Sequence, residues 1–341
     1  MAEHTTLDAF LDAWAGEDAS RAAVSRTVSA LIVAGRQIAA IVGRGALEDA
    51  MGAAVGSNAG GDTQKALDVR THDITVEALR AAPVARVGSE EADVEVVLDE
   101  SAPLAVAVDP LDGSSNIETN VSVGTLFAIL PNAGADTFTQ PGSKQLAAGF
   151  IVSGPATALV LTVGTGTHVF MLDRDSDAFV RTHADVRIEP TAKEYAINAS
   201  NQRHWQEPMR SYVADCVAGK SGPREKDFNM RWVGSLVADM FRILVRGGVY
   251  LYPGDQREKY ASGRLRLVYE CNPIAFVCEQ AGGAATDGER RILDIVPKGL
   301  HVHSPLIVGS IEEVEIIGRY YAGKQRRASA PLFAKRGLFL A

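Results

Sequence analysis

The sequence predicts an α/β protein, and its 341 residues are long enough for two parts that share a cleft. Between about residues 120 and 190, short apolar runs are broken by Gly, Asn and Pro, which is typical of a sheet with tight turns. After Asn198 helical and strand patterns alternate, as in an α/β unit. We therefore expect an N-terminal α+β part over residues 1–190 and a C-terminal α/β part over 191–341.

In the first part, apolar residues recur every three or four positions from Ser20 to about Val42, which predicts an amphipathic helix. Residues 52–63 are rich in Gly, Ala, Ser and Asn and predict a loop rather than a regular element. A second helix is expected from Asp73 to Arg80. The apolar run Leu104–Val108 predicts a buried strand that ends at Asp109 and opens into a loop, where functional sites often lie.

Further elements follow the same reasoning. Four more strands are expected at Thr125–Leu130, Gly149–Ser153, Ala158–Val163 and His168–Leu172, with a hairpin turn at Gly164-Thr165-Gly166. In the second part, the patterns predict helices over 206–218, 234–246 and 272–281 and strands over 248–252 and 305–309.

The composition argues against several classes of function and location. The net charge of -8 argues against a nucleic-acid partner, which would require a basic surface. The three cysteines form neither a CxxC pair nor an even disulfide framework, so we expect core thiols in a reducing compartment. The polar N-terminus predicts no signal peptide, and apolar stretches are too short for a membrane span. We expect a cytoplasmic protein.

The most informative segment reads DPLDGSSN over residues 109–116. Asp109 and Asp112 lie at the mouth of the predicted strand, where both carboxylates can point the same way, and the carbonyl of Leu111 adds a third oxygen. Oxygen ligands of this kind are those that Mg²⁺ prefers. A lone DxxD pair is more often an Asx turn, but small residues that suit a phosphate follow here: Gly113, Ser114 and Ser115.

Other acidic and basic residues gain meaning beside this segment. Glu90 and Glu91 would be an exposed pair in isolation, but next to a metal site they supply a ligand and a base. Asp62 is expected on the loop and Asp68 at its end. The stretch GRLRLVYECNP over 263–273 places Glu270 after an apolar strand, where a buried acid needs a partner or a metal. Its two arginines alternate with apolar residues, so they share a strand face that either meets phosphate or is simply solvated: Arg264 and Arg266.

From about residue 20 to 320 the chain resembles class I fructose-1,6-bisphosphatase, a family of the superfamily that also includes the inositol monophosphatases. The matching blocks are GDTQKALDV (61–69), SEE (89–91), DPLDGSSN (109–116), RWVGSLVAD (231–239), GGVYLYP (247–253) and GRLRLVYECNPIAFVCEQAGG (263–283). The resemblance implies a layered αβαβα sandwich, assembled as a homotetramer. It also implies hydrolysis of the 1-phosphate of fructose 1,6-bisphosphate with two or more Mg²⁺ per subunit, for which Mn²⁺ would substitute.

The resemblance assigns roles to individual positions. The implied metal ligands are Glu90, Asp109, the Leu111 carbonyl, Asp112 and Glu270, with Asp62 for an extra loop-dependent cation. The residues implied to activate water are Asp68 and Glu91. The 1-phosphate is implied to bind at Gly113, Ser114 and Ser115, with Asp112 also fixing sugar hydroxyls. The 6-phosphate end is implied to bind Asn198, Tyr252 and Arg264, with Arg231 reaching the site of a neighbouring subunit. Trp232 and Arg266 are further candidates for substrate binding.

The sequence departs from the family pattern at several positions. Trp232 and Asn201 replace tyrosines near the 6-phosphate. The N-terminal AMP-binding segment has no counterpart, and Pro103 and Leu104 replace a lysine and a tyrosine that help to bind AMP. We therefore expect AMP inhibition to be weak or absent. The tail over 330–339 resembles enzymes of autotrophic proteobacteria, so gluconeogenesis and the Calvin cycle are both implied pathways.

Three alternatives stay open at this point. Sedoheptulose 1,7-bisphosphate presents the same 1-phosphate end, so a phosphatase for that sugar, or for both sugars, fits the same motifs. A non-catalytic regulator that binds sugar phosphates is disfavoured because the set of acids is intact. A zinc site at His301 and His303 is disfavoured because no third ligand is near them in the sequence, so they are expected at a strand edge.

Overall fold

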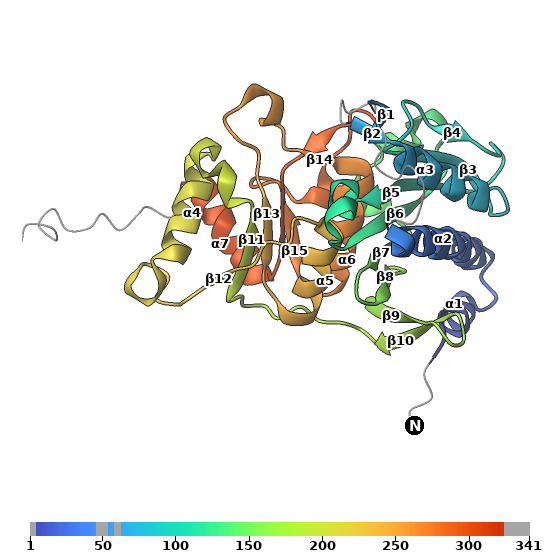
Figure 1. Ribbon diagram of the computed structural model, residues 1–341, viewed down its shortest axis with the longest axis horizontal. Helices are drawn as coiled ribbons and strands as arrows, with labels where there is room; N and C mark the ends of the chain where they lie inside the picture. Colours follow the sequence, from blue (N-terminus) through green and yellow to red (C-terminus); the bar gives the residue numbers. More distant parts are fainter. Residues whose placement is uncertain (1–4, 46–53, 58–62, 324–341) are drawn as a thin grey trace, which may run out of the picture.

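The protein is a layered αβαβα sandwich, which the computed structural model shows for residues 5–45, 54–57 and 63–323 (Figure 1). Helices α1 (Leu7–Ala15), α2 (Ala19–Arg44) and α3 (Ala66–Leu79) form the first layer. An eight-stranded sheet follows, then α5 (Leu236–Arg246) and α6 (Asn272–Gln280). A five-stranded sheet and the outer helices complete the order: α4 (Glu207–Val217) and α7 (Ile311–Tyr321). This confirms the expected fold class.

The large sheet has the strand order β10-β9-β8-β7-β6-β5-β3-β4 and is antiparallel except for the parallel pair β3 and β5. Its strands are β3 (Val84–Ser89), β4 (Val96–Val97), β5 (Leu104–Asp112), β6 (Val123–Pro131), β7 (Ala147–Ser153), β8 (Thr157–Thr162), β9 (Thr167–Asp173) and β10 (Ala178–His183). The four strands expected after residue 120 are confirmed as β6 to β9, and Gly164-Thr165-Gly166 forms the β8–β9 hairpin turn.

The smaller sheet has the order β12-β11-β13-β17-β15 and mixes parallel and antiparallel pairs. Its strands are β11 (Glu194–Ile197), β12 (Asn229–Met230), β13 (Val249–Tyr252), β15 (Ala284–Thr286) and β17 (Leu306–Gly309). The predicted helices of the second part are confirmed as α4, α5 and α6. A separate pair consists of β14 (Leu265–Arg266) and β16 (His303–Ser304).

Helices α5 and α6 contact both sheets and carry the apolar core between them. Met240 of α5 and Ile274 of α6 are fully buried there, together with Phe150 of the large sheet and Val308 of the small one. Helix α2 is long and apolar enough to cross a membrane by length and composition alone. Its apolar face instead packs on the large sheet, with Val28 fully buried, as in a core helix.

Two predictions in the N-terminal part need correction. Residues 52–63 were expected to lack a regular element, but β1 (Ala54–Ser57) and β2 (Thr63–Lys65) form an antiparallel pair, because strand pairing overrides their weak local preference. Helix α3 begins at Ala66 rather than Asp73. The Asp68 carboxylate accepts a hydrogen bond from the Lys65 N–H at 2.7 Å, so an acid expected in the loop belongs to the first helical turn.

Two further corrections concern the site itself. Strand β5 does not end at Asp109 but continues to Asp112. Glu270 does not follow a strand, because β14 covers only Leu265–Arg266 and residues Leu267–Cys271 form a π-helical turn that leads into α6. Continuous apolar runs do not distinguish a buried strand from a buried helical segment, and this explains the error.

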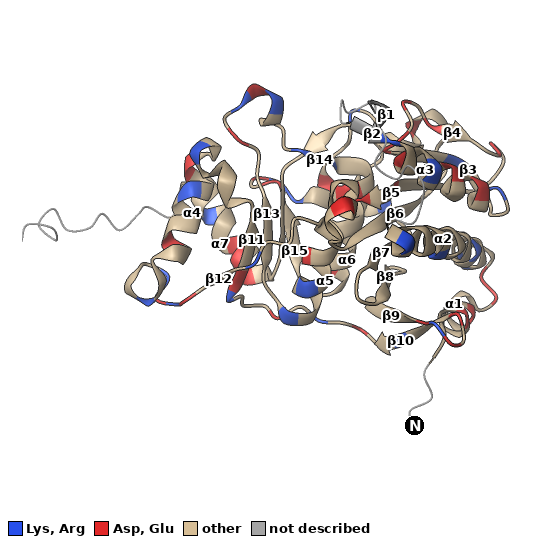
Figure 2. Cartoon of the chain, in the orientation of Figure 1, with Lys and Arg blue, Asp and Glu red and all other residues tan. Residues whose placement is uncertain are grey.

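Other expectations concern the thiols and charges. All three cysteines are free and buried, as predicted: Cys216, Cys271 and Cys278. Acidic and basic residues are interspersed over both parts of the molecule (Figure 2). Asp62 and the basic tail that begins at Lys324 lie outside the described residues.

Candidate active site

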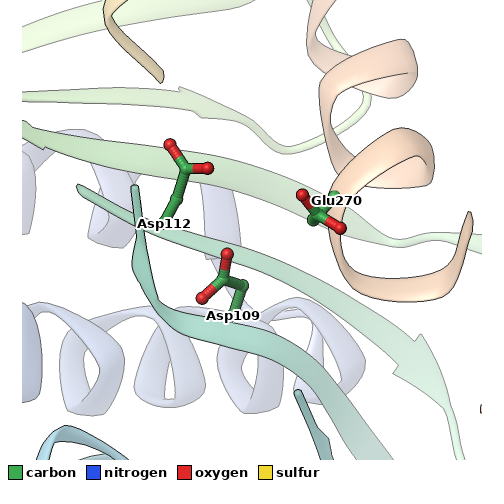
Figure 3. A group of neighbouring side chains, drawn as sticks. All are labelled: Asp109, Asp112 and Glu270. Carbon is green, nitrogen blue, oxygen red and sulfur yellow. The ribbon is translucent and has the colours of Figure 1, made fainter. Parts of the chain in front are cut away.

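Three buried carboxylates converge between the large sheet and α6. Oxygen atoms of Asp109, Asp112 and Glu270 lie within 4.8 Å of one another, and each residue is less than a tenth exposed. Figure 3 shows the two aspartates at the end of β5 with Glu270 opposite them. The structure thus brings together residues that are far apart in the sequence.

A bulge at the end of β5 places both aspartates on one side. The pairing of β5 with β6 shifts register between Asp109 and Asp112. Residues three apart in a regular strand point to opposite faces, so the shift is needed to align these two. Pro110 has no N–H for the ladder, and its carbonyl accepts a hydrogen bond from the Thr125 hydroxyl at 2.8 Å.

Each aspartate is also oriented by backbone N–H groups. The Leu111 N–H donates to Asp109 at 3.0 Å, which is the geometry of an Asx turn. The Val237 N–H, in the first turn of α5, donates to Asp112 at 3.2 Å. The positive end of this helix favours the carboxylate form of Asp112. The Asx turn considered from sequence is therefore present, within a larger acidic site.

Glu270 and Glu90 complete the acidic group. The Glu270 carboxylate accepts a hydrogen bond from the Arg266 backbone N–H. Glu90 follows β3, which lies parallel to β5, and its N–H donates to the Val108 carbonyl at 3.1 Å. The Arg266 guanidinium lies 4.0 Å from a Glu90 carboxylate oxygen.

Burial and mutual repulsion raise the pKa values of these acids. Burial raises the pKa of Asp112 to about 6, although the hydrogen bonds from the start of α5 lower it. Burial raises the pKa of Glu90 to about 7, against the effect of Arg266. Burial and then the charge of Glu90 raise the pKa of both Asp109 and Glu270 well above the usual range. Such a group is costly to ionise without a cation.

The donor set fits a hard divalent cation. All the candidate side-chain ligands are carboxylates, which suit Mg²⁺ or Mn²⁺. A cation among them would relieve the repulsion that raises their pKa values. Leu111, whose carbonyl was predicted as a ligand, is itself buried between the two aspartates along the chain.

The expected bases and the phosphate loop flank the carboxylates. Asp68 is buried, which raises its pKa, while the Lys65 N–H lowers it. Glu91 adjoins Glu90, and its N–H donates to the Ser89 hydroxyl at 3.3 Å. Gly113 has a φ of 77°, a left-handed turn that ends β5 and begins a short 3₁₀ helix with Ser114 and Ser115.

A second group of predicted residues lines a small cavity. Asn198, Tyr252 and Arg264 lie together there, with Asn201. The Trp232 ring stacks on Tyr250 at 5.6 Å and is tilted against Tyr252 at 5.9 Å. This aromatic group links Trp232 to the cavity wall.

Arg264 and Arg266 are placed differently from the expectation. Arg264 and Arg266 do not share a strand face that meets one phosphate, since β14 is too short. The Arg266 side chain is buried beside Glu90 and hydrogen bonds His303. Arg231 is half exposed and donates to Glu194 at 2.8 Å, in a cluster with Arg242 and Arg246.

The two histidines that follow α6 in the sequence, His301 and His303, hydrogen bond other side chains. His303 lies on β16 and pairs with Arg266. His301 hydrogen bonds the Tyr269 hydroxyl at 3.0 Å. The expectation of a strand edge is confirmed for His303 and wrong for His301, which lies in a turn before β16. Both rings have hydrogen-bond partners.

Several residues around the site were not predicted from the sequence. The Lys65 ammonium lies 3.5 Å from the Ser114 carbonyl and 3.4 Å from Glu118, beside the phosphate loop. Its position three residues before Asp68 in the sequence could have indicated that Lys65 lies near the site. The Tyr260 ring lies against the guanidinium groups of Arg257 and Arg264, and a loop of polar residues in the sequence does not indicate these contacts.

Comparisons with known proteins agree with this geometry. The N-terminal domain model of fructose-1-6-bisphosphatase matches residues 6–184, and the C-terminal domain model matches 188–322. A class 1 fructose-1,6-bisphosphatase of Azorhizobium caulinodans is 58% identical over 93% of this chain and 99% of the relative. One of Methylorubrum extorquens is 53% identical over 98% of this chain and 97% of the relative. The holo crystal structure of Leishmania major fructose-1,6-bisphosphatase has a TM-score of 0.86 and 30% identity, covering 94% of this chain and 99% of that one.

Proposed function

The chain belongs to the class 1 fructose-1,6-bisphosphatase family, and from this premise we propose how its own residues carry out the reaction. The reaction is the hydrolysis of fructose 1,6-bisphosphate to fructose 6-phosphate and phosphate. The observation that carries the assignment of the site is the convergence of Asp109, Asp112 and Glu270 within 4.8 Å in a buried position.

Metal binding falls to the acidic group. The proposed ligands are Glu90, Asp109, the Leu111 carbonyl, Asp112 and Glu270. We propose Mg²⁺, two or more per subunit, with Mn²⁺ accepted by the same oxygens. When bound, the metal supplies charge neutralisation for the phosphoryl group and for its leaving oxygen.

The 1-phosphate would lie over Gly113, Ser114 and Ser115. These residues are partly exposed, and backbone N–H groups at such a turn are suited to bind an anion. The Lys65 ammonium beside Ser114 adds positive charge at this end. The arrangement fixes the phosphorus against the carboxylates, which is the positioning that in-line attack needs.

Proton transfer falls to Asp68 and Glu91. The Lys65 N–H holds one oxygen of Asp68 at 2.7 Å, so the carboxylate is oriented before substrate binds. Burial raises the pKa of Asp68, which makes it a better proton acceptor than an exposed aspartate. We propose that these two acids orient the attacking water and take its proton.

The 6-phosphate end would bind in the cavity of Asn198, Tyr252 and Arg264. Arg231 is half exposed, and its proposed contact is with the site of a neighbouring subunit in a homotetramer. A cytoplasmic location and a role in gluconeogenesis or the Calvin cycle are part of the proposal.

Phosphate release from fructose 1,6-bisphosphate tests the site. We expect turnover with Mg²⁺, none with EDTA, and a loss of at least about a thousandfold in Asp109→Ala, because removing a ligand raises the barrier by several kcal/mol. Asp136→Ala, an exposed aspartate elsewhere on the chain, is the matched control and should keep full activity. Full activity in Asp109→Ala would refute the metal site, and faster turnover of sedoheptulose 1,7-bisphosphate would refute the substrate preference.

A further inference from the structure

The loop Pro253–Gly263 joins β13 to β14 beside the cavity of Arg264. Two backbone hydrogen bonds within the loop meet at Tyr260. Its carbonyl accepts from the N–H groups of Asp255 and Gly263, both at 3.1 Å. Gly263 has a φ of 87°, and a Cβ there would lie 2.2 Å from the Ser304 backbone. These contacts restrict the backbone conformation of the loop and fix the position of Tyr260.

The Tyr260 ring packs against two guanidinium groups. The guanidinium carbon of Arg264 lies 3.7 Å from the ring centroid, and that of Arg257 lies 4.7 Å from it. Both distances are well inside the range of about 6 Å for cation–π attraction. The shorter contact belongs to Arg264, which lines the cavity.

Asp255 holds Arg257 more closely than it holds Arg264. This buried carboxylate is bound by Arg257, whose Nε lies 3.1 Å from each of its oxygens. Arg264 approaches Asp255 only to 3.9 Å. Arg257 also donates to Asn201, another residue of the cavity wall, at 3.1 Å. Two guanidiniums thus share one carboxylate, which leaves positive charge at the cavity.

We propose that Tyr260 is a positioning residue that holds Arg264 by its ring face for the phosphate remote from the reacting bond. This inference rests on the proposed function of the cavity. A guanidinium that stacks on a ring keeps its N–H groups at its edge, where they can bind a phosphate in bidentate fashion. The ring therefore fixes the plane of Arg264 without using its donors.

Two measurements on the full chain test the proposal. The first is calorimetric binding of fructose 6-phosphate, which needs no turnover, and the second is steady-state kinetics with Mg²⁺. For Tyr260→Ala we expect Kd for fructose 6-phosphate and KM for fructose 1,6-bisphosphate to rise roughly three- to thirtyfold, the range of a cation–π contact, with kcat changed by less than about twofold. Tyr260→Phe keeps the ring and should match the wild type.

Two controls separate positioning from a general loss of structure. Fructose 1-phosphate lacks the remote phosphate, so Tyr260→Ala should leave its kcat/KM unchanged. In an Arg264→Met background, Tyr260→Ala should have no further effect. The proposal is overturned if Tyr260→Ala binds fructose 6-phosphate like the wild type, if Tyr260→Phe loses as much as Tyr260→Ala, or if the loss is equal for both sugars. A wild type that binds but does not hydrolyse would refute the reaction, and the binding data would still decide the role of Tyr260.

Discussion

Neutralising one of the clustered carboxylates should make the metal-free protein more stable while abolishing its activity. The variant is Asp109→Asn, which keeps the shape of the side chain. Asp109 is buried and lies with Asp112 and Glu270, whose oxygens are within 4.8 Å. Without a cation, ionisation of each pair at that distance costs about 3 kcal/mol at an effective dielectric constant of about 20.

The expected gain is smaller than the sum of those repulsions. Protons taken up at raised pKa values already relieve part of the repulsion, and the amide must still be buried. We therefore expect the free energy of unfolding in EDTA at about pH 8 to rise by about 2–4 kcal/mol. That corresponds to a Tm increase of about 3–6 °C for a chain of 341 residues. Mg²⁺ should raise the Tm of the wild type but not that of the variant.

Thermal unfolding in EDTA and in Mg²⁺ measures both effects. The matched control is Glu313→Gln, which is also a buried carboxylate but is paired with Arg224 at 2.6 Å. Removing that charge leaves a buried guanidinium without its partner, so Tm should fall, by several degrees or more. If Asp109→Asn is less stable than the wild type in EDTA, or if Mg²⁺ still stabilises it fully, the repulsion argument is wrong.

Three further predictions follow from other parts of the chain. Folding raises the pKa of Asp112 to about 6 and that of Glu90 to about 7, so both groups bind protons on folding. The free energy of unfolding of the metal-free protein should therefore fall as pH rises from about 4 to about 8. The Tm increase caused by Mg²⁺ should be larger at about pH 8 than at about pH 5.5. Burial raises the pKa of Cys216 to about 12 and that of Cys271 well above its usual range, so native protein should react with a thiol reagent far more slowly than unfolded protein; rapid native reaction would contradict this. AMP at millimolar concentration should leave phosphate release unchanged, because Leu104, the first residue of β5, is buried in the core and offers no hydroxyl. Half-inhibition at micromolar AMP would refute this prediction.

The parts of the site that are local in the sequence were predictable from it. The segment DPLDGSSN carries both aspartates and the phosphate loop within eight residues, so their proximity required no knowledge of the fold. The strands after residue 120 were predictable because turns and apolar runs mark them. Glu270 was assigned to the site by family resemblance, since its approach to Asp109 depends on how α6 packs on the large sheet.

The errors share a physical cause, which is tertiary context. The bulge in β5 depends on the Thr125 hydroxyl of the neighbouring strand, and the start of α3 depends on one side-chain hydrogen bond to Lys65. Neither contact produces a periodic pattern of apolar residues from which it could be predicted. The contact between Tyr260 and Arg264 likewise depends on the course of a loop, so no propensity predicts it.

The site joins the two sheets through the helices that lie between them. Asp112 ends a strand of the large sheet, yet it is held by the N–H of Val237 in α5, which also packs on the small sheet. Glu270 precedes α6, which contacts both sheets as well. The small sheet also carries Tyr252 at the end of β13, in the cavity proposed for the remote phosphate. A shift between the sheets would therefore change the carboxylate separations and the distance between the two phosphate positions together, so substrate length and metal binding are coupled through the packing of α5 and α6.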